Sequence, residues 1–282
     1  MSITINTNIA SLNAQRHLTQ TSNDLRASFE RLSTGLRIVH PSDDPAGLSI
    51  ADRLRADQRI AGVAVRNAND AISVVNIADG ALDQIGNILV RMGELAEQAG
   101  NGTLSGPQQS ALNQEFVALG SEVERIANTT TFNGQALLSG TPTLQFQIGL
   151  DSSSNSQITL SGVDGTLASL GLATAGTSAL KVSLVGGLTA SLSALDAVKG
   201  AIGSVAAYRG TLGAAESRLT AAVNNLQVAR ENFASAESQI RDVDVAEEVS
   251  RLVRLSILQQ AGAAVLAQAN QQPALALALL GA

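Results

Sequence analysis

The sequence predicts a mainly α protein, an elongated helical bundle or coiled coil with a small β-hairpin region. Three observations lead to this fold class. Apolar residues recur every three or four positions in five stretches, as on one face of a helix. One of these stretches keeps a seven-residue repeat, and between residues 144 and 160 the spacing changes to two, as in a strand. Only six of the 282 residues are aromatic whereas 45 are alanine, so we expect helices that pack closely.

The first helix is expected near the N-terminus. Its apolar positions form one run and, after a phase slip, a second: Ile5, Ile9 and Leu12, then Leu18, Leu25, Phe29, Leu32 and Leu36. His40-Pro41 is expected to end this helix, because a proline disfavours helical geometry in the residue before it.

The second helix is expected over residues 45–99. Asp43 and Asp44 precede Pro45, which suits the first turn of a helix. At ~1.5 Å per residue this helix would be roughly 80 Å long, so we expect an elongated molecule. Paired carboxylates also occur in acid–base and metal sites. Because acidic residues are favoured at a helix N-terminus, we interpret both as capping residues.

A third helix and a hairpin are expected next. The helix opens at Ser105-Gly106-Pro107 and ends before the turn signal Asn133-Gly134. Beyond it, apolar residues alternate with polar ones, at Leu144, Phe146, Ile148 and Leu150 and again at Ile158 and Leu160. Residues 161–190, rich in Gly, Ser, Thr and Ala, are expected to form a surface segment with little core.

The most regular pattern is a heptad repeat in the second half of the chain. Large residues recur every seven positions, at Val198, Val205, Leu212, Leu219, Leu226, Phe233 and Ile240. Three positions after the first six stand Ala201, Tyr208, Ala215, Ala222, Ala229 and Ala236. This alternation predicts a coiled-coil seam between closely approaching helices.

The last helix, expected over residues 243–270, is apolar around most of its circumference. One partner helix cannot cover such a surface, so other copies of the chain are expected to cover it. The predicted assembly interface combines both ends of the chain: Ile5, Ile9, Leu12, Leu25, Phe29, Leu32, Leu36, Val249, Leu252, Leu255, Leu258, Val265 and Leu266. Periodicity alone leaves open the alternative that these residues complete a closed bundle within one chain.

Composition excludes several classes of function. The chain has no cysteine and two histidines, His17 and His40, neither in a catalytic or ligand motif, so we expect no enzyme, no metal site and no cofactor. A net charge of −6 without a basic stripe argues against a nucleic-acid partner. The N-terminus lacks the features of a cleaved Sec signal. The last 28 residues carry no charge, but amide side chains interrupt them, so no membrane span is expected.

Six blocks of sequence, in order, resemble bacterial flagellins. They are INTN at 5–8 with SLNAQR at 11–16; RLSTGLRI at 31–38; DDPAGLSIADRL at 43–54; FNG at 132–134 with Leu137-Leu138; IRDVD at 240–244 with Ala246 and Glu247; and ILQQAG at 257–262 with LAQANQ at 266–271. The resemblance covers approximately residues 1–140 and 190–282.

The resemblance implies the subunit of the flagellar filament, in a minimal form with a short central region. It implies that 1–41 and 243–282 form an inner coiled-coil assembly domain. It also implies a rod-like helical bundle with a β-hairpin from 42–140 and 190–242, and a short, variable, outward-facing segment over 141–189. Implied partners are further copies of the chain, an export chaperone, the filament cap and hook-junction proteins. The implied location is the extracellular filament, reached by the flagellar type III route.

Two surface features follow from the same resemblance. Flagellins recognised by toll-like receptor 5 have a segment similar to LVRMGELA at 89–96, and Arg91, Leu95 and Glu115 match the residues concerned, whereas Gly93 replaces an expected charge. Sugars linked to hydroxyls of the central segment, as in some flagellins, would be attached at Ser152, Ser153 or Ser154.

Two other functions remain as alternatives. A hook-filament junction protein shares flagellin-like ends, although blocks 43–54 and 259–271 favour the filament subunit. An amphipathic lipid-binding or translocator protein would be expected to carry more Lys and Arg.

Overall fold

The computed structural model describes residues 7–140, 143–161, 163–174 and 179–280, with side chains described as far as residue 271. Five α-helices and two antiparallel strand pairs account for most of these residues, which confirms the mainly α class. The chain forms two compact units. Unit 1 contains residues 1–58 and 231–282, and unit 2 contains residues 59–230.

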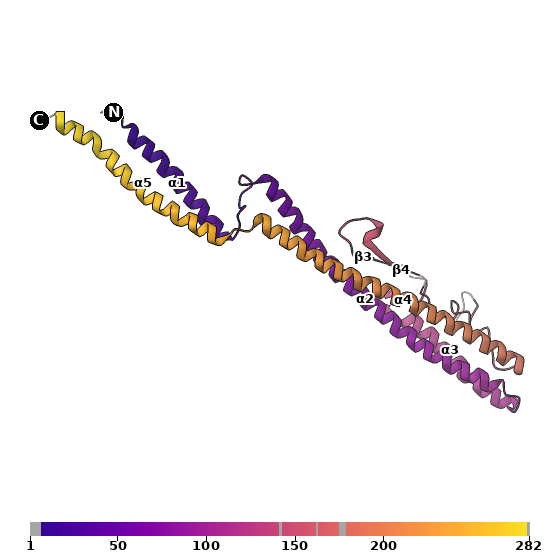
Figure 1. Ribbon diagram of the computed structural model, residues 1–282. Coiled ribbons are helices and arrows are strands. Elements are labelled where there is room, and N and C mark those ends of the chain that lie inside the picture. Colours follow the sequence, from indigo (N-terminus) through magenta and orange to yellow (C-terminus); the bar gives the residue numbers. More distant parts are fainter. Residues whose placement is uncertain (1–6, 141–142, 162, 175–178, 281–282) are drawn as a thin grey trace. The chain divides into compact units, whose positions relative to one another are not determined.

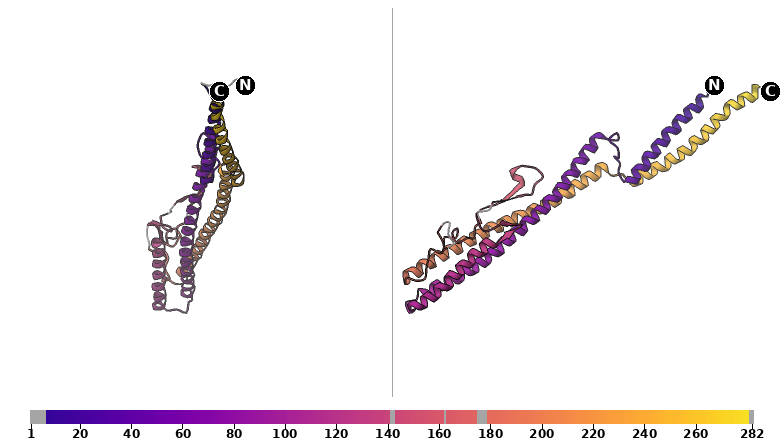
Figure 2. Two further views of the ribbon diagram at one scale, coloured as in Figure 1. Left: turned by 90° about the vertical axis from the view of Figure 1, so that its left-hand side faces the viewer. Right: turned by 180° about the vertical axis from the view of Figure 1, so that it is seen from behind.

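In unit 1 the helices α1 (Ile9–Thr34) and α5 (Val245–Leu280) lie side by side and antiparallel, in both views of the ribbon (Figures 1 and 2). The backbone joins them where α1 ends, because Leu36 forms an antiparallel bridge with Asp242 and the Arg37 amide donates to the Arg241 carbonyl. Asn8 caps α1 by accepting a hydrogen bond from the Ser11 amide at 3.0 Å.

Helix α1 ends earlier than expected. The chain leaves the helix at Gly35, whose φ of 73° lies in the left-handed region and whose amide bonds to the Arg31 carbonyl. Glycine adopts this conformation without the steric cost of a side chain, which makes it a common helix terminator. The expectation that His40-Pro41 ends the helix is therefore wrong, and Leu36 lies beyond the helix.

Unit 2 is built on three helices: α2 (Pro45–Ala99), which begins in unit 1, α3 (Gly106–Thr129) and α4 (Leu188–Arg241), which ends there. Both expected starts are confirmed, at Pro45 for α2 and after Ser105 for α3. The Ser105 amide donates to the Gln108 side chain at 2.8 Å, which satisfies one of the free amides at the start of α3.

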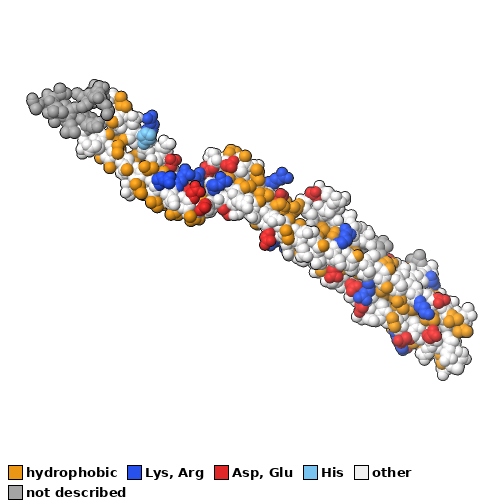
Figure 3. Space-filling model, viewed as in Figure 1, with side chains coloured by type: hydrophobic (Ala, Val, Ile, Leu, Met, Phe, Trp, Pro, Cys, Tyr) orange, Lys and Arg blue, Asp and Glu red, His pale blue; other side chains and the backbone are white. Residues whose placement is uncertain are grey.

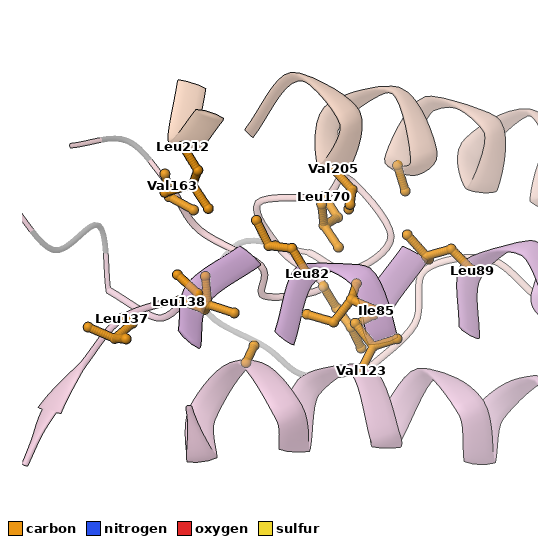
Figure 4. Close-up of a cluster of buried hydrophobic side chains, with 14 of the residues drawn as sticks. Leu82, Ile85, Leu89, Val123, Leu137, Leu138, Val163, Leu170, Val205 and Leu212 are labelled. Atoms are coloured by element: carbon orange, nitrogen blue, oxygen red, sulfur yellow. The ribbon is translucent and has the colours of Figure 1, made fainter. Parts of the chain in front are cut away.

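The heptad repeat of α4 is a buried seam, as predicted. Its members within unit 2 are all buried: Val198, Val205, Leu212, Leu219 and Leu226. Ala201 and Ala215 on the same face are buried as well. The seam packs against the side chains of α2, among them Leu82, Ile85 and Leu89, which form the centre of the core (Figure 4).

Two strand pairs follow α3. Strands β1 (Thr131–Phe132) and β2 (Gln135–Ala136) flank Asn133-Gly134, which have φ values of 50° and 77°. Two successive residues with positive φ are what a type I′ hairpin turn requires. Strands β3 (Leu144–Gln147) and β4 (Gln157–Leu160) pair antiparallel with Leu144 opposite Leu160, which confirms the predicted hairpin.

The expectation of little core in residues 161–190 is wrong. Val163, Leu167, Leu170, Leu172 and Leu184 are buried in the same core as the three helices (Figure 4). The segment is attached by hydrogen bonds from its backbone to α3, because the Leu167 amide donates to Glu124 and the Leu184 amide donates to Asn113. Composition did not reveal this role, since a few leucines between small residues are enough to close an alanine-rich bundle.

We predict that Leu172→Ala destabilises unit 2 by about 2–5 kcal/mol, because it leaves a cavity in the core. Val185→Ala, in the same segment but at a side chain that is 51% exposed, serves as the control and should cost less than about 0.5 kcal/mol. Urea unfolding of both variants, followed by circular dichroism, measures the difference. Equal costs would show that the segment is not part of the core.

Candidate functional site: the paired terminal helices

Most of the fully buried side chains in the contact between α1 and α5 are small, and leucines such as Leu18 are half-buried beside them. Ser11, Ser28 and Ala269 are the residues with buried side chains there, and Gly262 faces Leu18 so closely that an added Cβ would lie 3.4 Å from its Cδ1 atom. Small residues let two helix backbones approach each other. They also contribute little apolar area, so this contact by itself buries little hydrophobic surface.

Hydrogen bonds set the register of the two helices. Near the chain ends, Asn8 Nδ2 donates to the Ala269 carbonyl and Ser11 Oγ donates to Asn270 Oδ1, both at 2.7 Å. Further along, Gln259 Nε2 donates to Ser22 Oγ at 3.3 Å. These bonds require a defined geometry, but each contributes only about 1 kcal/mol net to the stability of the helix pair.

This contact covers the large apolar side chains of both helices only in part. Six of the predicted interface residues are exposed, each by at least 44%: Ile9, Leu12, Phe29, Val249, Leu258 and Val265. Six others are half-buried: Leu25, Leu32, Leu36, Leu252, Leu255 and Leu266. Ile5 lies outside the described residues. Figure 3 shows hydrophobic side chains along the visible surface of this part of the chain.

The exposed stripe on α5 is longer than the predicted set. Val245, Val253 and Ile257 are exposed by 58%, 50% and 60%. Together with Val249 they follow one another at intervals of four residues, which places them on one face of the helix. That spacing was visible in the sequence and would have added Val245, Val253 and Ile257 to the predicted residues.

Both acidic residues before α2 bind backbone amides, but only Asp44 caps α2, so the interpretation of Asp43 as a capping residue is wrong. Asp43 Oδ2 accepts hydrogen bonds from the amides of Val39 and His40, and Asp44 Oδ1 accepts one from the Gly47 amide at 2.9 Å. The bond from His40, aided by the one from Val39 and by Arg31, holds the pKa of Asp43 below its usual value. No group of three potential metal ligands occurs in the described part of the chain.

The receptor-related residues do not share one environment. Arg91 on α2 bonds to Glu115 on α3 and to Glu94, each at 2.9 Å, and all three side chains are exposed. Leu95 is fully buried in the core of unit 2. A Cβ added at Gly93 would lie 3.7 Å from Val198 Cγ1, an ordinary van der Waals contact, so this packing does not by itself require glycine.

The serines of the central segment are exposed next to a short 3₁₀ turn, Ser154–Ser156. Ser153 and Ser156 bond to Asp151, and these bonds hold the pKa of that carboxyl below its usual value. Elsewhere, no helix among the described residues has an apolar stretch long enough to cross a bilayer.

The two units thus define a helical subunit whose paired ends carry an uncovered apolar surface. Residues 5–143 match the family model of the bacterial flagellin N-terminal helical region, and residues 195–280 match that of the C-terminal helical region. A flagellin of Halalkalibacterium halodurans is 43% identical, with 98% of this chain and 99% of the relative covered. A flagellin of Bacillus subtilis is 38% identical, with 98% and 99% covered.

The chain belongs to the bacterial flagellin family. A solved structure, the crystal structure of Bacillus cereus flagellin, is 32% identical over 57% of this chain and 88% of that chain, with a TM-score of 0.49. Family membership rests on the sequence matches, which include both terminal helices and therefore the candidate interface.

Proposed function

We propose that this protein is a structural subunit that polymerises through its N- and C-terminal helices into the extracellular flagellar filament, for motility. The observation that carries the proposal is the apolar surface of α1 and α5. A soluble chain rarely exposes so many large apolar side chains on one pair of helices unless another molecule covers them.

The energetics favour association of several copies. Covering one Val, Leu or Ile side chain contributes about 1.5–3 kcal/mol, so a face with nine exposed large apolar residues can offset the entropy lost on association. Contacts between different faces of identical chains do not have to close on themselves. Such contacts generate a helical polymer.

The ends of the chain are proposed to become ordered as the polymer forms. In the contact between α1 and α5, the fully buried side chains are mostly small and the hydrogen bonds are few. Such a contact contributes little free energy to keeping two long helices folded in a free monomer. Burial between copies would supply the missing free energy, so folding of the ends would be coupled to binding.

The proposed division of labour follows the regions expected from the sequence. Residues 1–41 and 243–282 would form the inner assembly domain, 42–140 and 190–242 the rod-like bundle, and 141–189 the outward-facing segment. Export by the flagellar type III route, an export chaperone, the filament cap and hook-junction proteins belong to the same proposal. The role is structural, and we propose no catalytic activity.

Seeded assembly tests the function. Purified full-length protein should elongate short filament fragments, whereas a chain lacking residues 1–40 and 245–282 should not. Ile257→Ser, which removes one exposed apolar side chain from α5, should raise the residual monomer concentration about tenfold, since about 1.4 kcal/mol corresponds to a factor of ten. Val185→Ser, at an equally exposed position in unit 2, is the matched control.

Limited proteolysis of the same samples measures ordering. The free monomer should be cut first at both ends and the filament should be protected there. If full-length protein does not elongate seeds and its ends already resist protease, the chain forms a closed bundle, and a junction protein becomes the better assignment.

A second proposal concerns recognition by toll-like receptor 5. It is supported by the exposed pair Arg91 and Glu115, while Leu95 would act only from within the core. Arg91→Ala and Glu115→Ala should each weaken binding to the receptor ectodomain about tenfold, whereas Arg125→Ala, at another exposed ion pair on α3, should not. Unchanged affinity in both variants would contradict the proposal.

Sugar attachment at Ser152, Ser153 or Ser154 is also proposed, on the exposure of these hydroxyls. The mass of the peptide that contains them, from native filaments, tests it: an unmodified peptide contradicts the proposal.

A further inference from the structure

A pocket of 460 Å³ lies in unit 1, where α1 ends and α5 begins. It is lined by six carboxylates and three arginines, and basic and acidic side chains gather in this region of the surface in Figure 3. The carboxylates are Asp43, Asp44, Asp242, Asp244, Glu247 and Glu248. The lining therefore carries more negative than positive charge.

Three of these carboxylates are already engaged by the turn and the helix start. Asp43 binds backbone amides and lies 3.7 Å from Arg31, Asp44 caps α2, and Asp244 accepts bonds from the amides of Ala246 and Glu247. Among the described residues, the carboxylates of Asp242, Glu247 and Glu248 have no such partner.

Glu248 is the residue that points to a ligand. Its side chain lines the pocket, the residue is only 7% exposed, and its Oε1 atom is buried without a hydrogen-bond partner among the described residues. Arg251, one turn away in the same lining, gives this oxygen no hydrogen bond in the described part of the chain. A buried carboxylate oxygen without a donor costs free energy, so a cationic donor that enters the pocket would be stabilising.

We propose that this pocket binds an arginine side chain from a second copy of the chain. The inference rests on the proposed function, since it supplies one directional contact of the polymer. The choice of arginine follows from composition: 16 of the 18 basic residues are arginine. A guanidinium group can also bond two carboxylates at once, which suits a pocket with three free ones.

We assign the contact to arginines of α2, because three of them lie on one face of the helix. Arg55, Arg59 and Arg66 are separated by four and seven residues, so they lie on one face of the helix, and all three are exposed without an ion pair among the described residues. The opposite face of α2 carries the buried Ala61, Ala64 and Ala68. We call this row the α2 arginine face.

This pairing has a consequence for the geometry of assembly. The pocket and the α2 arginine face are different surfaces of the same chain, so each copy can offer its arginines to one neighbour and its pocket to another. Such a contact is heterologous and open-ended, as a filament requires. An ion pair with the buried carboxylate of Glu248 would also define the register between copies, which apolar contacts alone specify poorly.

A double-mutant cycle in the seeded assembly of full-length protein tests the pairing. Glu248→Gln and the triple variant Arg55→Gln/Arg59→Gln/Arg66→Gln should each raise the residual monomer concentration about tenfold. Combined, they should raise it little further, because both remove the same contact. Glu231→Gln and Arg218→Gln, at exposed side chains of α4 that have no ion pair with any described residue, are the matched controls and should have little effect.

A mixed disulfide provides a readout that leaves Glu248 and the arginines in place. The chain has no cysteine, so Gly62→Cys on the α2 arginine face and Gln239→Cys on the pocket lining report only the contact between them. An added Cβ at Gly62 meets no atom within 4 Å. Filaments assembled from a mixture of the two single variants should yield disulfide-linked dimers. Gly213→Cys is the control, because an added Cβ there also meets no atom within 4 Å, and it should not cross-link with Gln239→Cys.

The outcomes separate this inference from the function. If the wild-type chain fails to elongate seeds, both the filament function and the contact are contradicted. A second case is that the wild-type chain elongates seeds while the free-energy costs of Glu248→Gln and of the triple arginine variant add up in the combined variant, or while no mixed disulfide forms. Either result overturns the pocket contact and leaves the filament function standing.

Discussion

The contact between α1 and α5 is the constraint on which the rest of this molecule depends. Serine, alanine and glycine at that contact allow the helices to approach, and side-chain hydrogen bonds set their register. Many of the large apolar residues of both helices remain exposed, and the others are only half-buried. Most of the free energy that two such helices can gain is then available only when another surface covers them, which ties the stability of the chain ends to association.

Unit 2 differs from unit 1 in having a large core of its own. Large apolar side chains are buried along the heptad seam of α4 and the facing side of α2, and Val163, Leu170 and Leu184 fill what three alanine-rich helices leave open. Other large apolar side chains of unit 2, such as Val90 and Leu188, are exposed. Ion pairs such as Arg209 with Asp79 and Asp83 stay at the surface, where they contribute little to stability. One chain therefore combines a unit with an extensive core and a unit whose paired helices bury few large apolar side chains fully.

Apolar contacts between copies are strong but weakly directional, whereas a filament needs a defined arrangement of subunits. Charged groups at the turn between α4 and α5 can supply that direction. The Glu248 pocket lies beside backbone contacts that already hold the end of α1 to the start of α5, through Leu36, Arg37 and Asp242. A cation bound there would meet carboxylates whose positions are fixed by the fold, which favours specificity over raw affinity.

The sequence by itself determined the helices, the hairpin, the heptad seam and the family, because helical periodicity, capping residues and turn glycines are local signals. It also identified the apolar residues of the terminal helices. Only the tertiary structure decided which of them, such as Phe29 and Val265, stay exposed and which, such as Leu32, are half-buried, since periodicity does not say which face meets a partner. It likewise decided that Leu172 belongs to the core, that α1 stops at Gly35, and that Glu248 is buried without a donor, because each depends on residues distant in sequence or on a backbone conformation that composition does not encode.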